Sequence, residues 1–105
     1  MLINTKKIRL NCKRDTAERL IEHIDALVMG NPLENRYSEL VLFASLAEVS
    51  HQLEGKLIPG VKEIKFGVSH AQLAALGVWQ ERYASSPTHY DGTVVRRWLM
   101  SNSRR

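Results

Sequence analysis

Residues 6–12, KKIRLNC, and residues 62–68, KEIKFGV, are the two stretches that decide the fold of this chain. In both, apolar and polar side chains alternate, which is the period of a β-strand with one buried face. The spacing therefore predicts two short strands whose second face is polar and mostly basic. The expected inward positions are Ile8, Leu10, Cys12, Ile64, Phe66 and Val68.

Each predicted strand is followed by apolar residues at helical spacing. Asp15 and Glu18 stand three residues apart after the first strand, and Ser69 and Gln72 do so after the second, which is the spacing of a capping box. A further helix is expected in residues 35–54, which are apolar around much of the circumference and end at a glycine. The last expected helix is residues 93–101, TVVRRWLMS.

The order of elements is repeated within the chain. A shift of 56 residues places Ile8 and Leu10 on Ile64 and Phe66, with basic residues again beside them. A lone strand with two helices buries too little apolar surface to be stable. We therefore expect one domain over residues 1–105, made of two copies. The copies are residues 6–54 and 62–101, joined by a connector at 55–61.

Composition and charge exclude several classes of protein. With 44% hydrophobic and 25% charged residues in 105, the chain is expected to be one globular domain. It has no apolar run of about 20 residues for a membrane span, and charges interrupt its N-terminal stretch, so a cytoplasmic location without membrane contact is expected. One cysteine, four scattered histidines and the lack of a phosphate-binding glycine loop predict no metal, no cofactor and no enzyme.

A basic alternating strand followed by two helices, the second opening with Ser-Glu-Leu, resembles the ribbon-helix-helix fold of MetJ- and Arc-type DNA-binding proteins. The stretches that carry the resemblance are KKIRLNC, DTAERLIEHIDALVMG and RYSELVLFASLAEV. It covers residues 6–54 closely. It covers residues 62–100 more loosely, because the last helix opens with Asp-Gly-Thr.

The resemblance implies an α+β, mostly helical fold. Because the family pairs two copies, the two strands would form an antiparallel ribbon over four helices, as a pseudo-dimer within one chain. Single-chain tandem versions are similar to accessory proteins of conjugative plasmids and of T-DNA transfer, whereas the commoner role of the fold is transcriptional repression. Double-stranded DNA is the implied partner, and a relaxase or another DNA-processing protein is a candidate second one. We expect the chain to be a monomer in solution. Separate molecules are expected to associate only when they bind side by side on DNA.

A two-stranded ribbon fits the major groove, where Arg or Lys can bind guanine and Asn can bind adenine. The first strand offers more of these groups than the second, where Gly67 has no side chain, so an asymmetric DNA site is expected. The candidate base contacts are Lys7, Arg9, Asn11, Glu63 and Lys65.

Phosphate contacts are expected in two places. In the family, free N–H groups at the start of the second helix bind a phosphate, which carries over to residues 36–38 and to Thr93, although Asp91 disfavours an anion in the second copy. Basic residues that flank the first strand are further candidates. The full set is Lys6, Lys13, Arg14, Arg36, Tyr37, Ser38 and Thr93.

The rival hypothesis is a protein-interaction module with no DNA role. It uses the apolar second helix, with residues such as Phe43 or Val49 in contact with a partner protein. Cys12, Trp79 and Trp98 are expected to be core residues.

Overall fold

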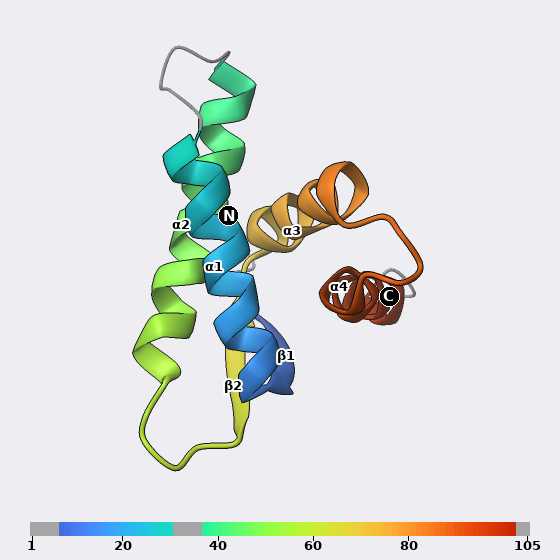
Figure 1. Cartoon of the computed structure of the whole chain (residues 1–105). Helices are drawn as coiled ribbons and strands as arrows, with labels where there is room; N and C mark the ends of the chain where they lie inside the picture. Colours follow the sequence, from blue (N-terminus) through green and yellow to red (C-terminus); the bar gives the residue numbers. More distant parts are fainter. Residues whose placement is uncertain (1–6, 31–36, 103–105) are drawn as a thin grey trace, which may run out of the picture.

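The computed structural model describes residues 7–30 and 37–102, and this part of the chain is α+β and mostly helical. The strand–helix–helix order expected for each half is confirmed (Figure 1). The elements are β1 (Ile8–Lys13), α1 (Arg14–Gly30), α2 (Tyr37–Lys56), β2 (Glu63–Val68), α3 (His70–Tyr83) and α4 (Tyr90–Asn102).

Strands β1 and β2 pair antiparallel as a two-stranded ribbon. The register places Leu10 opposite Phe66 and Asn11 opposite Lys65. Because side chains alternate across a strand, one face of the ribbon is apolar and buried, as the sequence predicts. The inward residues with at most 8% exposure are Leu10, Cys12, Ile64, Phe66 and Val68.

The helix boundaries differ slightly from the expected ones. α1 begins at Arg14, directly after β1, so Asp15 lies inside the first turn. The capping box of α3 is confirmed, because Ser69 Oγ accepts from the Gln72 N–H at 3.1 Å and Gln72 Oε1 accepts from the Ser69 N–H at 3.0 Å. α2 continues one residue past Gly55, to Lys56.

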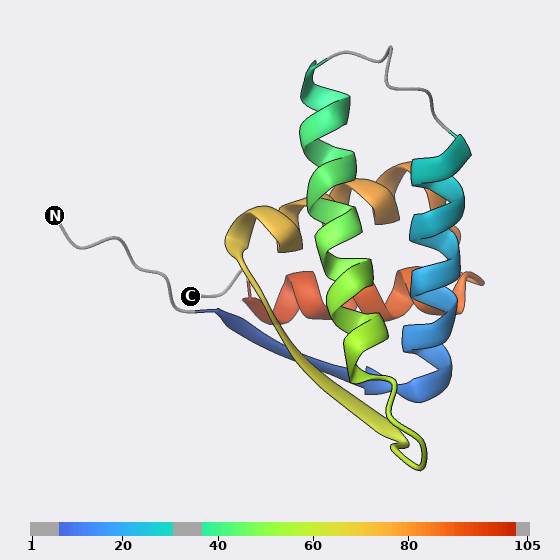
Figure 2. The ribbon, with the colours of Figure 1, turned by 90° about the vertical axis from the view of Figure 1, so that its left-hand side faces the viewer.

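The core lies between the inner face of the ribbon and the four helices. α1 and α2 stand side by side as a hairpin, and α3 and α4 cross behind them (Figure 2). The ribbon lies at the end of this hairpin where α1 begins and α2 ends. Residues from all four helices meet in the core with no exposed surface, including Leu20, Leu46, Leu76 and Val95.

α2 is buried along one side only. Phe43, Leu46, Val49 and Leu53 face the core, whereas Val41 is 50% exposed. The apolar residues that the sequence places around much of its circumference are therefore buried on one part of it only. Trp79 and Trp98, at 2% and 8% exposure, are core residues as expected.

Candidate nucleic-acid interface

The ribbon gathers all the predicted base contacts on its outer face. Lys7 directly before β1 is exposed, as are Arg9 and Asn11 on β1 and Glu63 and Lys65 on β2. The two strands hold these side chains in a fixed pattern, because Asn11 is opposite Lys65. Five residues that are far apart in the sequence therefore share one surface opposite the core.

The charge of this outer face changes along the ribbon. At one end, Lys7 and Arg9 lie near Lys65 without an acidic neighbour on the face. At the other end, Lys13 is directly opposite Glu63. Opposite charges at facing positions offset each other. The basic potential is therefore strongest at the end where β1 begins.

Gly67 has a packing role on this face. A Cβ atom placed at Gly67 would lie 3.2 Å from both Cβ and Cδ of Lys7. The aliphatic stem of Lys7 therefore crosses the position that a side chain at residue 67 would occupy. The missing side chain, which in the sequence looks like a loss of base contact, leaves room for the lysine.

Side chains from the helices close both edges of the ribbon. From α2, Gln52 Nε2 donates to the Gly67 carbonyl at 2.7 Å, and Gln52 Oε1 accepts from the Gly67 N–H at 3.1 Å. From α4, Trp98 Nε1 donates to the Asn11 carbonyl at 3.1 Å. Unpaired edge groups would otherwise be available to a further strand. At these positions the outer face, and not the strand edge, is open to a ligand.

A hollow lies beside each edge. The hollow on the β2 side has a volume of about 650 Å³ and is lined by α2 and by the basic end of the ribbon. The hollow on the β1 side has a volume of about 410 Å³ and is lined by α4 and by the other end.

The predicted phosphate contacts are not brought together in one place. Lys6 and Arg36 lie outside the described residues. Tyr37 and Ser38 open α2 at the end of the hairpin that lies away from the ribbon (Figures 1 and 2). Lys13 is exposed on the ribbon itself.

Arg14 and Thr93 make contacts within the chain. Arg14 Nη1 donates to the carbonyls of Ile58 and Val61 at 2.7 and 3.0 Å, which ties α1 to the connector before β2. Thr93 Oγ1 donates to the His89 carbonyl at 3.0 Å in the first turn of α4. Both side chains have structural partners, and their phosphate contacts stay predictions.

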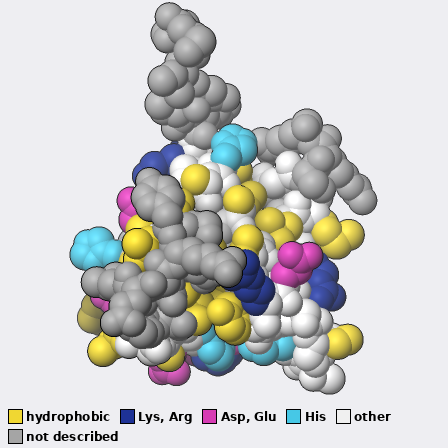
Figure 3. All heavy atoms as spheres, turned by 90° about the horizontal axis from the view of Figure 1, so that it is seen from above, with side chains coloured by type: hydrophobic (Ala, Val, Ile, Leu, Met, Phe, Trp, Pro, Cys, Tyr) yellow, Lys and Arg dark blue, Asp and Glu magenta, His cyan; other side chains and the backbone are white. Residues whose placement is uncertain are grey.

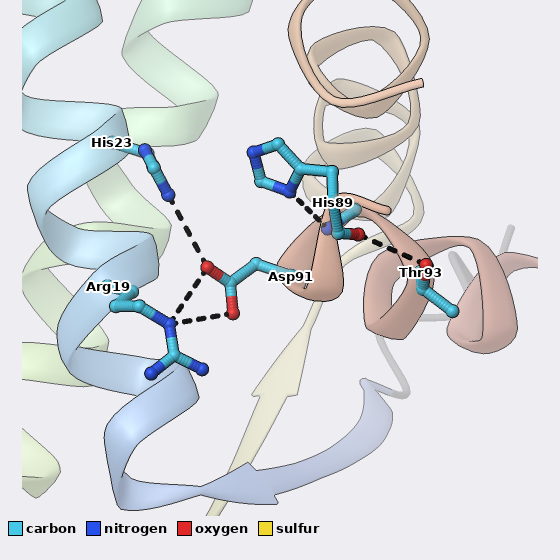
Figure 4. Close-up of polar contacts among 6 residues, drawn as sticks. Arg19, His23, His89, Asp91 and Thr93 are labelled. Atoms are coloured by element: carbon cyan, nitrogen blue, oxygen red, sulfur yellow. Dashed lines mark hydrogen bonds and ion pairs between the residues drawn. The ribbon is translucent and has the colours of Figure 1, made fainter. Parts of the chain in front are cut away.

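A polar cluster that spacing did not reveal joins α1 to the start of α4 (Figure 4). Buried Asp91 accepts from Arg19 Nε at 3.0 and 3.1 Å, and His23 Nε2 lies 3.4 Å from the same carboxylate. His89 Nδ1 accepts from the Gly92 N–H at 3.0 Å. The negative charge of Asp91 is therefore paired with Arg19 within the protein.

Other chemistry is sparse in the part of the chain described. Those residues contain no group of three or more His, Cys, Asp or Glu side chains placed to hold a metal. Among them, no helix combines the length and apolar character needed to cross a bilayer. Burial, together with the nearby charges of Asp91 and Glu63, raises the pKa of Cys12 to about 11. This thiol is therefore protonated at neutral pH and is a poor nucleophile.

Comparisons with models of protein families, with curated proteins and with solved structures give no match to this chain.

Proposed function

We propose that this chain binds double-stranded DNA by placing the outer face of the ribbon in the major groove. The observation that carries the proposal is the contrast between the two faces. One face is buried in the core, while the other exposes a set of polar side chains of which most are basic. The major groove is about 12 Å wide and admits a two-stranded ribbon. The outer residues are Lys7, Arg9, Asn11, Lys13, Glu63 and Lys65.

The side chains of β1 would make most of the base contacts that distinguish one DNA sequence from another. Arg9 lies opposite Gly67, so no facing side chain competes for its donors, and it can bind guanine O6 and N7. Asn11 can bind adenine through its amide. On β2, Glu63 can accept from a cytosine amino group, where Lys13 opposite offsets its charge. An asymmetric DNA site follows from this arrangement.

We further propose that the chain is a pseudo-dimer of two ribbon-helix-helix copies. Leu10 pairs with Phe66, and the Ile8–Val68 and Cys12–Ile64 pairs lie two residues to either side, so a two-fold axis through the Leu10–Phe66 pair would exchange the strands. The same axis would exchange α1 with α3 and α2 with α4, and the contacts of Gln52 and Trp98 on the two ribbon edges support it. The protein is then a monomer in solution. A stable dimer at micromolar concentration in sedimentation equilibrium would contradict this proposal.

The test of DNA binding is selection from a pool of random duplexes at two salt concentrations. The wild type is compared with the triple variant Lys7→Ala, Arg9→Ala, Asn11→Ala. The matched control is Arg82→Ala, an exposed basic residue in the last turn of α3, at the end that lies away from β2. We expect one asymmetric motif with the wild type and the control, and none with the triple variant while its circular dichroism is unchanged.

The biological role is proposed from the resemblance: an accessory protein of DNA transfer, or a transcriptional repressor. A neighbouring relaxase gene would favour transfer, with the relaxase as a partner. A neighbouring toxin gene would favour repression.

The rival function is a protein-interaction module. The two residues suggested for its partner contact are both buried. Phe43 and Val49 are 6% and 0% exposed, so a partner cannot reach them in this conformation. Seen from above in Figure 3, hydrophobic side chains are visible in several places, with charged and histidine side chains between them. If the module were correct, the triple variant above would keep its function.

A further inference from the structure

The two helices that border the ribbon carry further basic residues beside its edges. α2 reaches the edge of β2 through Gln52, and α4 reaches the edge of β1 through Trp98. The helix residues next to these contacts therefore lie to either side of the outer face. The resemblance to the ribbon-helix-helix family did not point to these helix residues. It places the phosphate contacts at the start of the second helix of each copy.

On the β2 side the neighbouring basic residue is Lys56. It follows Gln52 by four residues, so the two side chains lie on the same face of α2. Lys56 lines the hollow together with Lys7, Arg9 and Lys65, and no acidic residue lines it. Lys56 is exposed and makes no ion pair with any other described residue.

On the β1 side the neighbouring basic residue is Arg97. It precedes Trp98 and lines the second hollow with Lys13, Glu63 and Ser101. Arg97 is exposed, and within residues 7–30 and 37–102 it too has no ion-pair partner. This hollow is less positive than the first, because Glu63 belongs to it.

We propose that Lys56 and Arg97 bind backbone phosphates of DNA on opposite sides of the ribbon. This inference rests on the proposed function, because it needs the outer face to lie in the major groove. The two sugar-phosphate backbones form the walls of that groove, so basic groups beside both edges of an inserted ribbon meet phosphates. The contact at Lys56 is the stronger one, because its hollow has four basic residues and no acid.

The position of Lys56 on α2 decides which end of this helix lies beside the DNA backbone. Tyr37 and Ser38 lie at the end of the hairpin away from the ribbon, whereas Lys56 ends the same helix beside it. The end of α2, and not its start, would approach the phosphates.

The experiment measures affinity for the selected duplex over a series of salt concentrations. The variants are Lys56→Ala, Arg97→Ala and their combination, and the control is Arg82→Ala, which also removes one exposed positive charge. Each phosphate contact contributes about 0.9 to the slope of log affinity against log salt. We expect each single variant to flatten the slope by about 0.9 and the combination by about twice that, with the selected motif unchanged. The control variant keeps the wild-type slope.

A second measurement locates the contacts. Single methylphosphonate substitutions neutralise one phosphate of the duplex at a time. The substitution at the phosphate bound by Lys56 weakens the wild type but leaves Lys56→Ala unaffected, and the sensitive phosphates for Lys56 and Arg97 lie on different strands.

The outcomes separate the two proposals. If the wild type selects a motif but Lys56→Ala and Arg97→Ala keep the wild-type slope, the phosphate contacts are wrong and DNA binding by the ribbon stands. If the wild type binds no duplex at low salt, both proposals are wrong. Loss of the motif in the combined variant would also contradict the inference, because phosphate contacts do not select sequence.

Discussion

Arg19 Nε donates to both carboxylate oxygens of Asp91, at 3.0 and 3.1 Å, across 72 positions of sequence (Figure 4). The Asp91 side chain is 4% exposed and that of Arg19 is 44% exposed. The hydrogen bond with Asp91 raises the pKa of Arg19, so the guanidinium stays charged. The pair ties α1, in the first half of the chain, to the beginning of α4 in the second half.

We predict that Arg19 and Asp91 are energetically coupled. Replacing Arg19 by alanine leaves a buried carboxylate without its main donor, which costs about 1–3 kcal/mol. In a double-mutant cycle with Asp91→Ala, the coupling in the free energy of unfolding should reach about that size. Urea denaturation measures it. The Arg14–Glu18 pair within one turn of α1, at 3.5 Å and with side chains 30% and 50% exposed, is the control and should show about 0.3–0.5 kcal/mol. Equal coupling in the two cycles would contradict the prediction.

Cys12 should make stability depend on pH in the alkaline range. Burial raises its pKa from 9.0 to about 11, with Asp91 and Glu63 adding to the effect. Because the pKa is higher in the folded state, the thiol's contribution to stability is complete below pH 9 and is lost as pH rises towards 11. The difference in free energy of unfolding between wild type and Cys12→Ala should shrink over that interval.

The measurement is urea denaturation of both proteins under reducing conditions from pH 8 upward. Iodoacetamide should also react slowly with the native protein and quickly in urea. A native thiol that reacts as fast as the unfolded one would show that Cys12 is not buried.

Gly92 is expected to be required for α4 to pack beside the end of α3. A Cβ atom there would contact the Ala84 carbonyl and lie 2.8 Å from Ala84 Cβ. Since backbone atoms cannot give way easily, Gly92→Ala should destabilise the protein by about 1–3 kcal/mol. Gly55→Ala is the matched control, because nothing lies within 4 Å of a Cβ atom there and alanine favours a helix. Thermal melts should show a lower midpoint for the first variant and no loss for the second.

Gln52 should affect both stability and DNA binding. Gln52→Ala removes two hydrogen bonds to Gly67 and should cost about 1 kcal/mol. Gln52→Glu keeps an acceptor but loses the donor, and it places a negative charge in the basic hollow. We therefore expect affinity for the selected duplex to fall in the order wild type, Gln52→Ala, Gln52→Glu. Titration at fixed salt measures this order, and equal affinity of the two variants would contradict the charge argument.

Local patterns were sufficient for much of the fold. Alternation in residues 6–12 and 62–68 predicted both strands and their buried faces, because a pleated strand turns successive side chains to opposite sides. The Ser69–Gln72 capping box was predictable for a similar reason, since both partners lie within one turn. The same alternation identified Lys7, Arg9, Asn11, Glu63 and Lys65 as outward residues.

Contacts between distant segments were decided by the tertiary structure. Spacing in the sequence says nothing about Arg19 meeting Asp91, Trp98 meeting the Asn11 carbonyl, or Gln52 closing the edge at Gly67, because each pair depends on how whole helices are placed. The path of α2 is the most consequential case. It carries Tyr37 away from the ribbon and Lys56 towards it, and only packing against α1, the ribbon and α3 sets that direction.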